Sequence, residues 1–158
     1  MVKVLVASGN QKKLAELEAV LAELGIAGVE LVSMRDVDAY PEPVEDGLTF
    51  EDNALIKARA GAAATGLACV ADDSGLAVTA LKGMPGVLSA RWSGTHGDDA
   101  ANNALLLAQM TDIALRDAAF VSCCALVGPA GDEFTAEGRW EGQLLREPRG
   151  DNGFGYDP

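Results

Sequence analysis

The sequence is poor in several residue types, and each shortage excludes a class of protein. Among 158 residues there are one histidine, three cysteines and 5% aromatic residues. An odd number of cysteines does not suit the disulfide framework of a small secreted domain, and the lack of Cys-x-x-Cys spacing argues against a zinc site. We therefore expect Cys69, Cys123 and Cys124 to be reduced core residues of a cytoplasmic protein.

Positive charge and long apolar runs are also scarce. The 12 Lys and Arg against 24 Asp and Glu give a net charge of −12, which opposes binding to nucleic acid polymers and anionic membranes. No apolar run approaches the length that crosses a bilayer. A small phosphorylated ligand still suits this charge, because it needs only a few local cations, backbone amides or an accompanying Mg²⁺.

What is present is the pattern of a single α/β domain with its own core. The helix expected from Gln11 carries an apolar stripe of Leu14, Leu17, Leu21 and Leu24, and Gly25 ends it. A turn at 128–132 predicts a hairpin between the last two strands. Strand patterns cover 3–7, 29–32, 67–71, 76–78, 118–127 and 133–140, and helix patterns begin near 11, 49 and 98.

The most informative stretch is 70–78, where Asp72 and Asp73 interrupt an apolar strand pattern. Carboxylates in such surroundings need a cation, a proton or water, and a divalent metal would satisfy them. Alternation along a strand sends the two side chains to opposite faces, whereas a turn at Ser74-Gly75 would bend the chain. We expect one acid to act directly and the other to support it; the alternative is a polar turn between two strands.

The start of the first helix carries cations where the helix dipole disfavours them. Ser8-Gly9-Asn10-Gln11 reads as a turn and helix cap, and Lys12 and Lys13 follow in the first turn. A bound anion would reverse this penalty, so the segment predicts a phosphate cradle, although it lacks the spacing of a P-loop. The alternative is a capped helix with solvated lysines.

Two further segments carry candidate ligand contacts. Thr49 and Asp52 match a capping box that opens a helix, on which Asn53 and Lys57 share one face. That face is either an ordinary solvent-exposed face of the helix or a ligand-binding surface. The glycine-rich segment 146–158 can approach a ligand through its backbone and stack an aromatic ring on it.

Three other residues are weaker candidates. Arg91 and Trp92 suit either contact with a phosphate or base, or a subunit interface with the helix at 98–110. His96, the single histidine, has no nucleophile visibly paired with it.

In their order along the chain, the motifs resemble the inosine triphosphate pyrophosphatase family. The matching segments are 8–14, 45–54 with Lys57-Ala58, 71–76, Pro85-Gly86 with Ser89-Ala90-Arg91, and 153–158. The resemblance implies a long twisted mixed sheet flanked by helices, with two lobes and a central nucleotide cleft. It also implies a cytoplasmic homodimer that uses Mg²⁺ to hydrolyse ITP, dITP or XTP to the monophosphate and pyrophosphate, and so cleanses the nucleotide pool.

The resemblance also implies roles for individual residues. Asp73 and Glu45 would hold the metal, with Glu42 an alternative to Glu45, and Asp73 would accept a proton from the attacking water. Asp72, Lys57 and Lys13 would complete the catalytic group. The residues implied in substrate binding are Ser8, Gly9, Asn10, Gln11, Lys12, Lys13, Asn53, Ser74, Phe154, Gly155, Tyr156 and Asp157.

One departure from the family keeps two alternatives open. Family members continue beyond the Phe-Gly-Tyr-Asp-Pro segment with a lysine and a Ser-His-Arg motif that recognise triphosphate and the purine 6-oxo group. We therefore expect residues 1–158 to form one pyrophosphatase domain without that C-terminal segment. A nucleotide-binding module without activity is one alternative. An aspartate-based phosphatase is the other, disfavoured because its two acids stand two residues apart.

Overall fold

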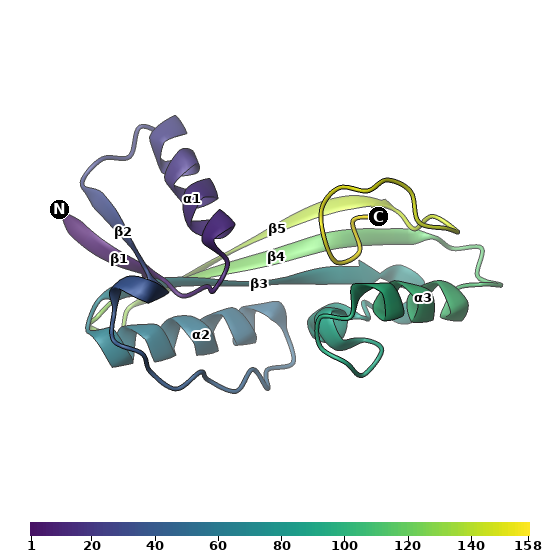
Figure 1. Cartoon of the computed structure of the whole chain (residues 1–158), viewed down its shortest axis with the longest axis horizontal. Helices are drawn as coiled ribbons and strands as arrows, with labels where there is room; N and C mark the ends of the chain where they lie inside the picture. Colours follow the sequence, from purple (N-terminus) through teal and green to yellow (C-terminus); the bar gives the residue numbers. More distant parts are fainter. The chain divides into compact units, whose positions relative to one another are not determined.

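The structure is a computed structural model that describes all residues 1–158. It contains five strands and three α-helices, and its residues group into two compact units. Unit 1 comprises 1–73 and 123–137, and unit 2 comprises 74–122 and 138–158. The elements are β1 (Val2–Val6), α1 (Gln11–Glu23), β2 (Val29–Ser33), α2 (Phe50–Thr65), β3 (Ala68–Val78), α3 (Asp99–Gln109), β4 (Asp117–Val127) and β5 (Glu133–Gln143) (Figure 1).

The five strands form one mixed sheet in the order β2-β1-β3-β4-β5. β1 is parallel to both of its neighbours, so that Leu5 lies opposite Val32 on β2 and Cys69 on β3. A tight turn joins β4 to β5, with the Gly128 N–H donating to the Asp132 carbonyl at 2.8 Å. The expected α/β class, mixed sheet and hairpin are therefore confirmed.

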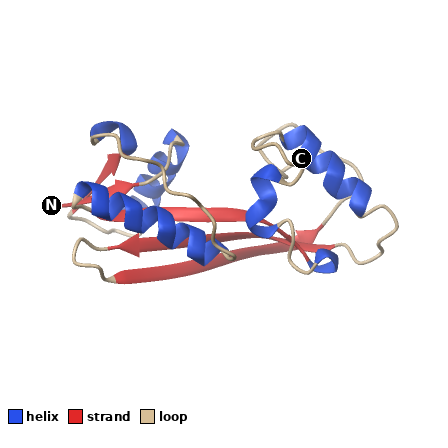
Figure 2. Cartoon of the chain, turned by 90° about the horizontal axis from the view of Figure 1, so that it is seen from below, coloured by secondary structure: helices blue, strands red, loops and turns tan.

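Small side chains on α2 let this helix pack closely in unit 1. Ala54, Ala58 and Ala62 are buried against Leu5 and Cys69. In both views α2 runs along β3, and α1 lies on the opposite side of the unit 1 strands (Figures 1 and 2). The α2 capping box forms as expected, with Thr49 accepting from the Asp52 N–H and Gly66 ending the helix in a left-handed conformation.

Unit 2 has a separate core. Leu76 and Val78 of β3 are buried with Leu106 and Met110 of α3. The buried Ser89 hydroxyl accepts from the Leu76 N–H at 2.9 Å and donates to the Gly86 carbonyl at 2.6 Å. These bonds fix the 3-10 segment Gly86–Arg91 against the start of the unit 2 part of β3.

Three sequence expectations are wrong. Ser74-Gly75 does not bend the chain, because β3 runs without interruption from 68 to 78. Leu24 is 66% exposed because it lies beyond Glu23, the last residue of α1, whereas Leu14, Leu17 and Leu21 are half-buried. Cys124 is also exposed, because alternation on β4 turns it away from the core that holds Cys123.

All three cysteines are free thiols. None of the helices is long and apolar enough to cross a membrane. The two compact units match the two lobes that the resemblance implies, whereas the central cleft stays a prediction.

Candidate functional site

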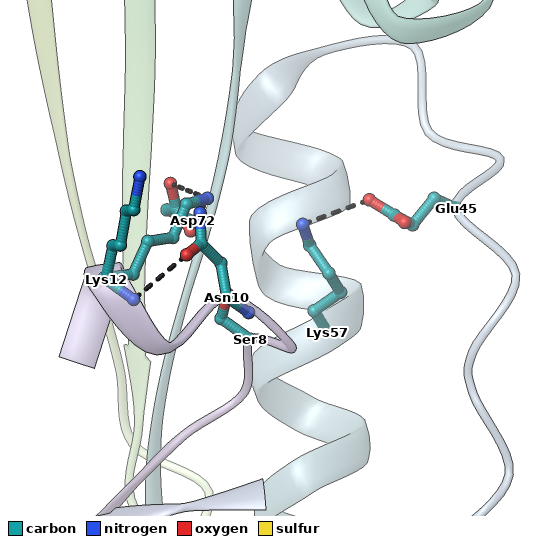
Figure 3. Close-up of polar contacts among 7 residues, drawn as sticks. Ser8, Asn10, Lys12, Glu45, Lys57 and Asp72 are labelled. Carbon is teal, nitrogen blue, oxygen red and sulfur yellow. Dashed lines mark hydrogen bonds and ion pairs between the residues drawn. The ribbon is translucent and has the colours of Figure 1, made fainter. Parts of the chain in front are cut away.

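The turn between β1 and α1 is organised by its own side chains. The Ser8 hydroxyl accepts from the Asn10 N–H at 3.1 Å, and the Asn10 side chain caps α1 by accepting from the Lys12 N–H at 3.0 Å. Figure 3 shows Ser8 and Asn10 in this turn, with the Lys12 backbone bonded to Asn10. No acidic residue lies in the first turn of α1, so the turn keeps the positive character that an anion would favour.

Lys13 and Lys12 differ in what they contact. The Lys13 ammonium donates to both carboxylate oxygens of Asp72 at 2.9 Å. Lys12 has an exposed side chain and makes no ion pair. Lys13 is therefore the lysine that the fold places against β3, beside a carboxylate of opposite charge.

The adjacent acids of β3 face different elements, as alternation predicts for a continuous strand. Asp72 contacts α1 through Lys13, whereas Asp73 accepts a hydrogen bond from the Asn53 amide of α2 at 3.2 Å. Because the strand does not bend, Lys13 pairs with Asp72 rather than facing Asp73. This arrangement favours separate tasks for the two carboxylates.

Two residues on one face of α2 contact the two carboxylates that the resemblance assigns to a metal. Asn53 is only 3% exposed, so it is not part of an ordinary solvent-exposed face of the helix. Its side chain accepts from the Gly47 N–H at 2.8 Å and donates to Asp73. One turn further along α2, the Lys57 ammonium lies 3.1 Å from the Glu45 carboxylate (Figure 3). The loop holding Glu45 and the strand holding Asp73 are thus tied to neighbouring turns of the same helix.

The oxygen donors in unit 1 suit a hard divalent cation. No group of three or more His, Cys, Asp or Glu side chains converges in the structure, which argues against a site built by protein ligands alone. Mg²⁺ is commonly held by one or two carboxylates, with waters and substrate phosphates completing its shell. Asp73 and Glu45, which contact the same face of α2, fit that type of site.

Unit 2 contributes a cavity of 490 Å³. Both Phe154 and Trp140 border it with largely exposed rings, 73% and 78% respectively. Of the residues implied in substrate binding, Ser74, Phe154, Gly155, Tyr156 and Asp157 line this one cavity. Their convergence supports a shared role in binding a flat, partly apolar group.

Several cavity residues escaped the sequence analysis. Phe120 of β4 and Arg139 and Trp140 of β5 also line the cavity. A signal was present on β5, where Gly138 and Gly142 stand two residues before and after Trp140 and so share its face of the strand. The signal is weak because every residue of β5 is exposed.

The segment that carries Phe154 and Tyr156 is closed by Asp157. The Phe154 N–H donates to the Asp157 carboxylate at 3.0 Å, and the Asp157 N–H donates to the Phe154 carbonyl at 3.0 Å. The Tyr156 hydroxyl donates to the Ser89 carbonyl at 2.6 Å. Burial, followed by the nearby Asp99 carboxylate, raises the pKa of Tyr156 to about 12.

The weaker candidates contact none of these groups. His96 and Arg91 are exposed, and neither makes a side-chain hydrogen bond or ion pair. The Trp92 indole donates to Gln109 of α3 at 2.8 Å. The structure therefore gives the 91–96 segment no part in the candidate site.

Comparison with known proteins decides the family, because a sequence model of the Ham1 family matches residues 4–158. The chain belongs to the Ham1 family. It is 65% identical over 158 residues to the dITP/XTP pyrophosphatase of Corynebacterium glutamicum strain R, covering 99% of this chain and 77% of that protein. It is 68% identical to the dITP/XTP pyrophosphatase of Mycobacteroides abscessus, with the same coverage.

Solved structures of Ham1-family proteins agree with this fold. A crystal structure of the nucleoside-triphosphatase, or dITP/XTP pyrophosphatase, from Mycobacterium abscessus matches with a TM-score of 0.89 at 68% identity, over 99% of this chain and 81% of that one. A HAM1 protein from Coxiella burnetii matches with a TM-score of 0.92 at 39% identity, over 100% and 80%. The family resemblance read from the motifs is confirmed.

Proposed function

We propose that this Ham1-family protein hydrolyses ITP, dITP and XTP to the nucleoside monophosphate and pyrophosphate. The observation that carries this function is the 65–68% identity, over 99% of the chain, to enzymes named dITP/XTP pyrophosphatases. The protein is a nucleoside triphosphate pyrophosphatase, a hydrolase of the α–β phosphoanhydride. Its proposed role in the cell is to remove deaminated purine nucleotides from the cytoplasmic pool.

The triphosphate is proposed to bind at the start of α1 and along α2. Ser8, Gly9, Asn10 and Gln11 would present backbone amides and polar side chains, and Lys12 and Lys13 would supply charge. Both Lys13 and Lys57 already have carboxylate partners in unit 1. An arriving triphosphate would replace those partners, so the lysines are held in position before the substrate binds.

Asp73 and Glu45 are proposed to hold Mg²⁺. Their fit rests on two hard oxygen donors tied to adjacent turns of α2 by Asn53 and Lys57. When bound, the metal ion would polarise phosphate oxygens and offset their charge. Glu45 is favoured over Glu42 because Glu45 is the one that contacts α2.

In the proposed reaction, a water oxygen forms a bond to the α-phosphorus as the bond from that phosphorus to the oxygen bridging it to the β-phosphorus breaks. Asp73 accepts the proton of that water, which suits a carboxylate oriented by a buried amide. Lys57 and Lys13 stabilise the charge that spreads over the phosphate oxygens. Pyrophosphate leaves with the electrons of the broken bond, and no covalent enzyme intermediate forms.

The cavity of unit 2 is proposed to receive the nucleobase. Phe154 and Tyr156 would offer ring faces and Ser74 a hydroxyl, and Gly155 and Asp157 also line this cavity. We also propose a homodimer, for which Arg91, Trp92 and α3 remain the candidate interface.

The product distinguishes the proposed reaction from its alternatives. With Mg²⁺, we expect one pyrophosphate and one IMP per ITP, and much slower turnover of ATP, measured by ³¹P NMR and by chromatography of the nucleotides. Added EDTA should stop the reaction, and excess Mg²⁺ should restore it. Release of single phosphate would favour an aspartate-based phosphatase, and ITP binding without turnover would favour a binding module; either result contradicts the proposal.

A further inference from the structure

Helix α3 holds the Phe154–Asp157 segment through both backbone groups of one glycine. The Gly155 N–H donates to the Asp99 carboxylate at 2.9 Å, and the Asn103 amide donates to the Gly155 carbonyl at 2.8 Å. Asp99 and Asn103 are four residues apart, so they lie on the same face of α3. Neither residue lines the 490 Å³ cavity.

The position of Gly155 in the chain explains how this contact can orient the two aromatic rings. Gly155 has a φ of +58° and lies between the two aromatic residues of the segment. A left-handed residue turns the chain sharply, so its orientation determines the directions in which the Phe154 and Tyr156 rings leave the backbone. Fixing both the N–H and the carbonyl of Gly155 therefore fixes both rings.

The other bonds of the segment do not duplicate this effect. Those between Phe154 and Asp157 are internal to the segment and determine its shape, not its place in unit 2. The Tyr156 hydroxyl bond to the Ser89 carbonyl anchors one ring tip. With the α3 contacts removed, the closed turn would keep its shape and its attachment through Tyr156, whose ring packs on the unit 2 core, and through the Pro158 carbonyl, which accepts from the Arg149 N–H at 2.8 Å. No other hydrogen bond would then hold the Gly155 backbone, so the orientation of Phe154 in particular would be less restricted.

We infer that Asp99 and Asn103 are positioning residues for nucleobase recognition. They hold Phe154 and Tyr156 in the arrangement that binds the purine, without touching the purine themselves. This inference rests on the proposed function, because it takes the cavity beside these rings as the nucleobase site.

The expected effect is on substrate affinity rather than on the chemical step. When the binding-competent form is populated only in part, the apparent dissociation constant rises by the inverse of that fraction. The same ring contacts act in the bound ground state and the transition state, so KM rises while kcat changes little. We expect KM for ITP to rise about tenfold in Asp99→Ala and less in Asn103→Ala, because bonds to an ionised group are the stronger ones.

A first measurement tests the contact itself. Hydrogen–deuterium exchange should accelerate at the Gly155 amide in Asp99→Ala and return toward the original rate in Asp99→Asn, whose amide oxygen can still accept the bond. Asp112→Ala is the matched control, since it removes an exposed carboxylate just beyond the other end of α3 that makes no hydrogen bond or ion pair. Exchange in the core strands should not change in any of these variants.

A second measurement tests the consequence and separates the two ends of the substrate. The affinity for IMP, measured by calorimetry without metal and as product inhibition, should fall by the same factor as KM rises. Inhibition by pyrophosphate, which has no base, should not change. Asp99→Asn should recover most of the IMP affinity, and Asp112→Ala should retain all of it.

The results keep this inference distinct from the proposed function. If the original protein releases no pyrophosphate from ITP, the proposed function fails. If that protein is active but Asp99→Ala keeps its KM and IMP affinity despite faster Gly155 exchange, the inference is wrong. It is equally wrong if Asp99→Ala lowers kcat and pyrophosphate affinity together with thermal stability, because the role of Asp99 is then general and structural.

Discussion

The candidate residues of unit 1 include two lysine–carboxylate ion pairs, whereas those of unit 2 form an aromatic-lined cavity whose Phe154–Asp157 segment is held by hydrogen bonds to its neighbours. In unit 1, Lys13 contacts Asp72, and Lys57 contacts Glu45. In unit 2, Gly155 and Tyr156 are fixed by bonds to α3 and to the Ser89 carbonyl. Unit 1 is thus equipped for a charged group, and unit 2 for a flat one.

This difference assigns separate tasks to the two units. Every nucleoside triphosphate carries the same phosphate chain, so charge complementarity in unit 1 supports binding and catalysis without distinguishing bases. Discrimination then depends on the shape and hydrogen bonding of the unit 2 cavity. Changes at the charged candidates of unit 1 should therefore act mainly on kcat, and changes at the cavity of unit 2 mainly on KM and on base preference.

The largest expected effect separates the two acids of unit 1. Asp73→Asn should lower kcat for ITP by at least about a hundredfold, because it removes the proposed proton acceptor and metal ligand. Asp72→Asn should have a much smaller effect on kcat, since Asp72 acts through Lys13 on the other face of β3. Stopped-flow detection of pyrophosphate measures both, with circular dichroism to verify the fold. An equal or greater loss in Asp72→Asn would reverse the assignment.

The second largest expected effect is on the free energy of unfolding, and it compares how closely a glycine is packed in each unit. A Cβ on Gly75 would overlap the Ser89 hydroxyl and lie 2.8 Å from the Gly86 carbonyl, so Gly75→Ala should lower the free energy of unfolding by roughly 2–3 kcal/mol. A Cβ on Gly61 would lie 2.5 Å from the Cys69 sulfur, but alanine favours the helix by up to about 1 kcal/mol, which offsets part of the cost.

Urea unfolding of these variants measures the difference. Gly142→Ala is the control, because a Cβ there meets nothing within 4 Å. A smaller loss in Gly75→Ala than in Gly61→Ala would mean that the Ser89 contact yields more readily than the helix packing of unit 1.

The smallest expected effect is the alkaline loss of stability, which begins at a different pH in each unit. Burial raises the pKa of Cys69 from 9.0 to about 11 and that of Tyr156 from 10.0 to about 12. The folded state binds these protons more tightly, so each contribution is complete below the lower pKa and is lost as the pH rises through the higher one. The windows are about pH 9–11 for Cys69 and about pH 10–12 for Tyr156.

Unfolding titrations of Cys69→Ala and Tyr156→Phe measure these two contributions. Each variant should flatten the pH dependence of the unfolding free energy only in its own window, apart from a constant offset for the lost contacts. If both variants flatten the same window, or neither changes the slope, the burial of these groups does not control the alkaline transition.

The elements were predictable from the sequence where the local signal was strong. The capping box of Thr49 and Asp52, which begins α2, follows from local chemistry alone. The strand around Asp72 and Asp73 was predicted as two pieces because polar residues interrupt the apolar pattern. Pairing with neighbouring strands overrides that interruption, and pairing is not visible in a single segment.

The sequence predicted which types of residue form the candidate site, but not which of these residues contact one another. Lysines and carboxylates stood out because each is unfavourable where it lies without a counter-charge. Which acid meets which lysine depends on the face of β3 that packs on each helix, and this is a tertiary property. Asp99 and Asn103 escaped notice for another reason, since polar residues early in a helix are common and nothing local indicates that they bind a distant glycine.

Uninterrupted β3 also limits which mutations this protein tolerates. Cys69 and Ala71 are buried in the core of unit 1, and Leu76 and Val78 in the core of unit 2. Side chains alternate between the two faces of a strand, so the number of residues between these two pairs determines which face each pair occupies. A single inserted or deleted residue in 72–75 would turn one of these pairs toward solvent. The length of this segment is therefore under a constraint of its own, separate from the demands on the side chains of Asp73 and Gly75.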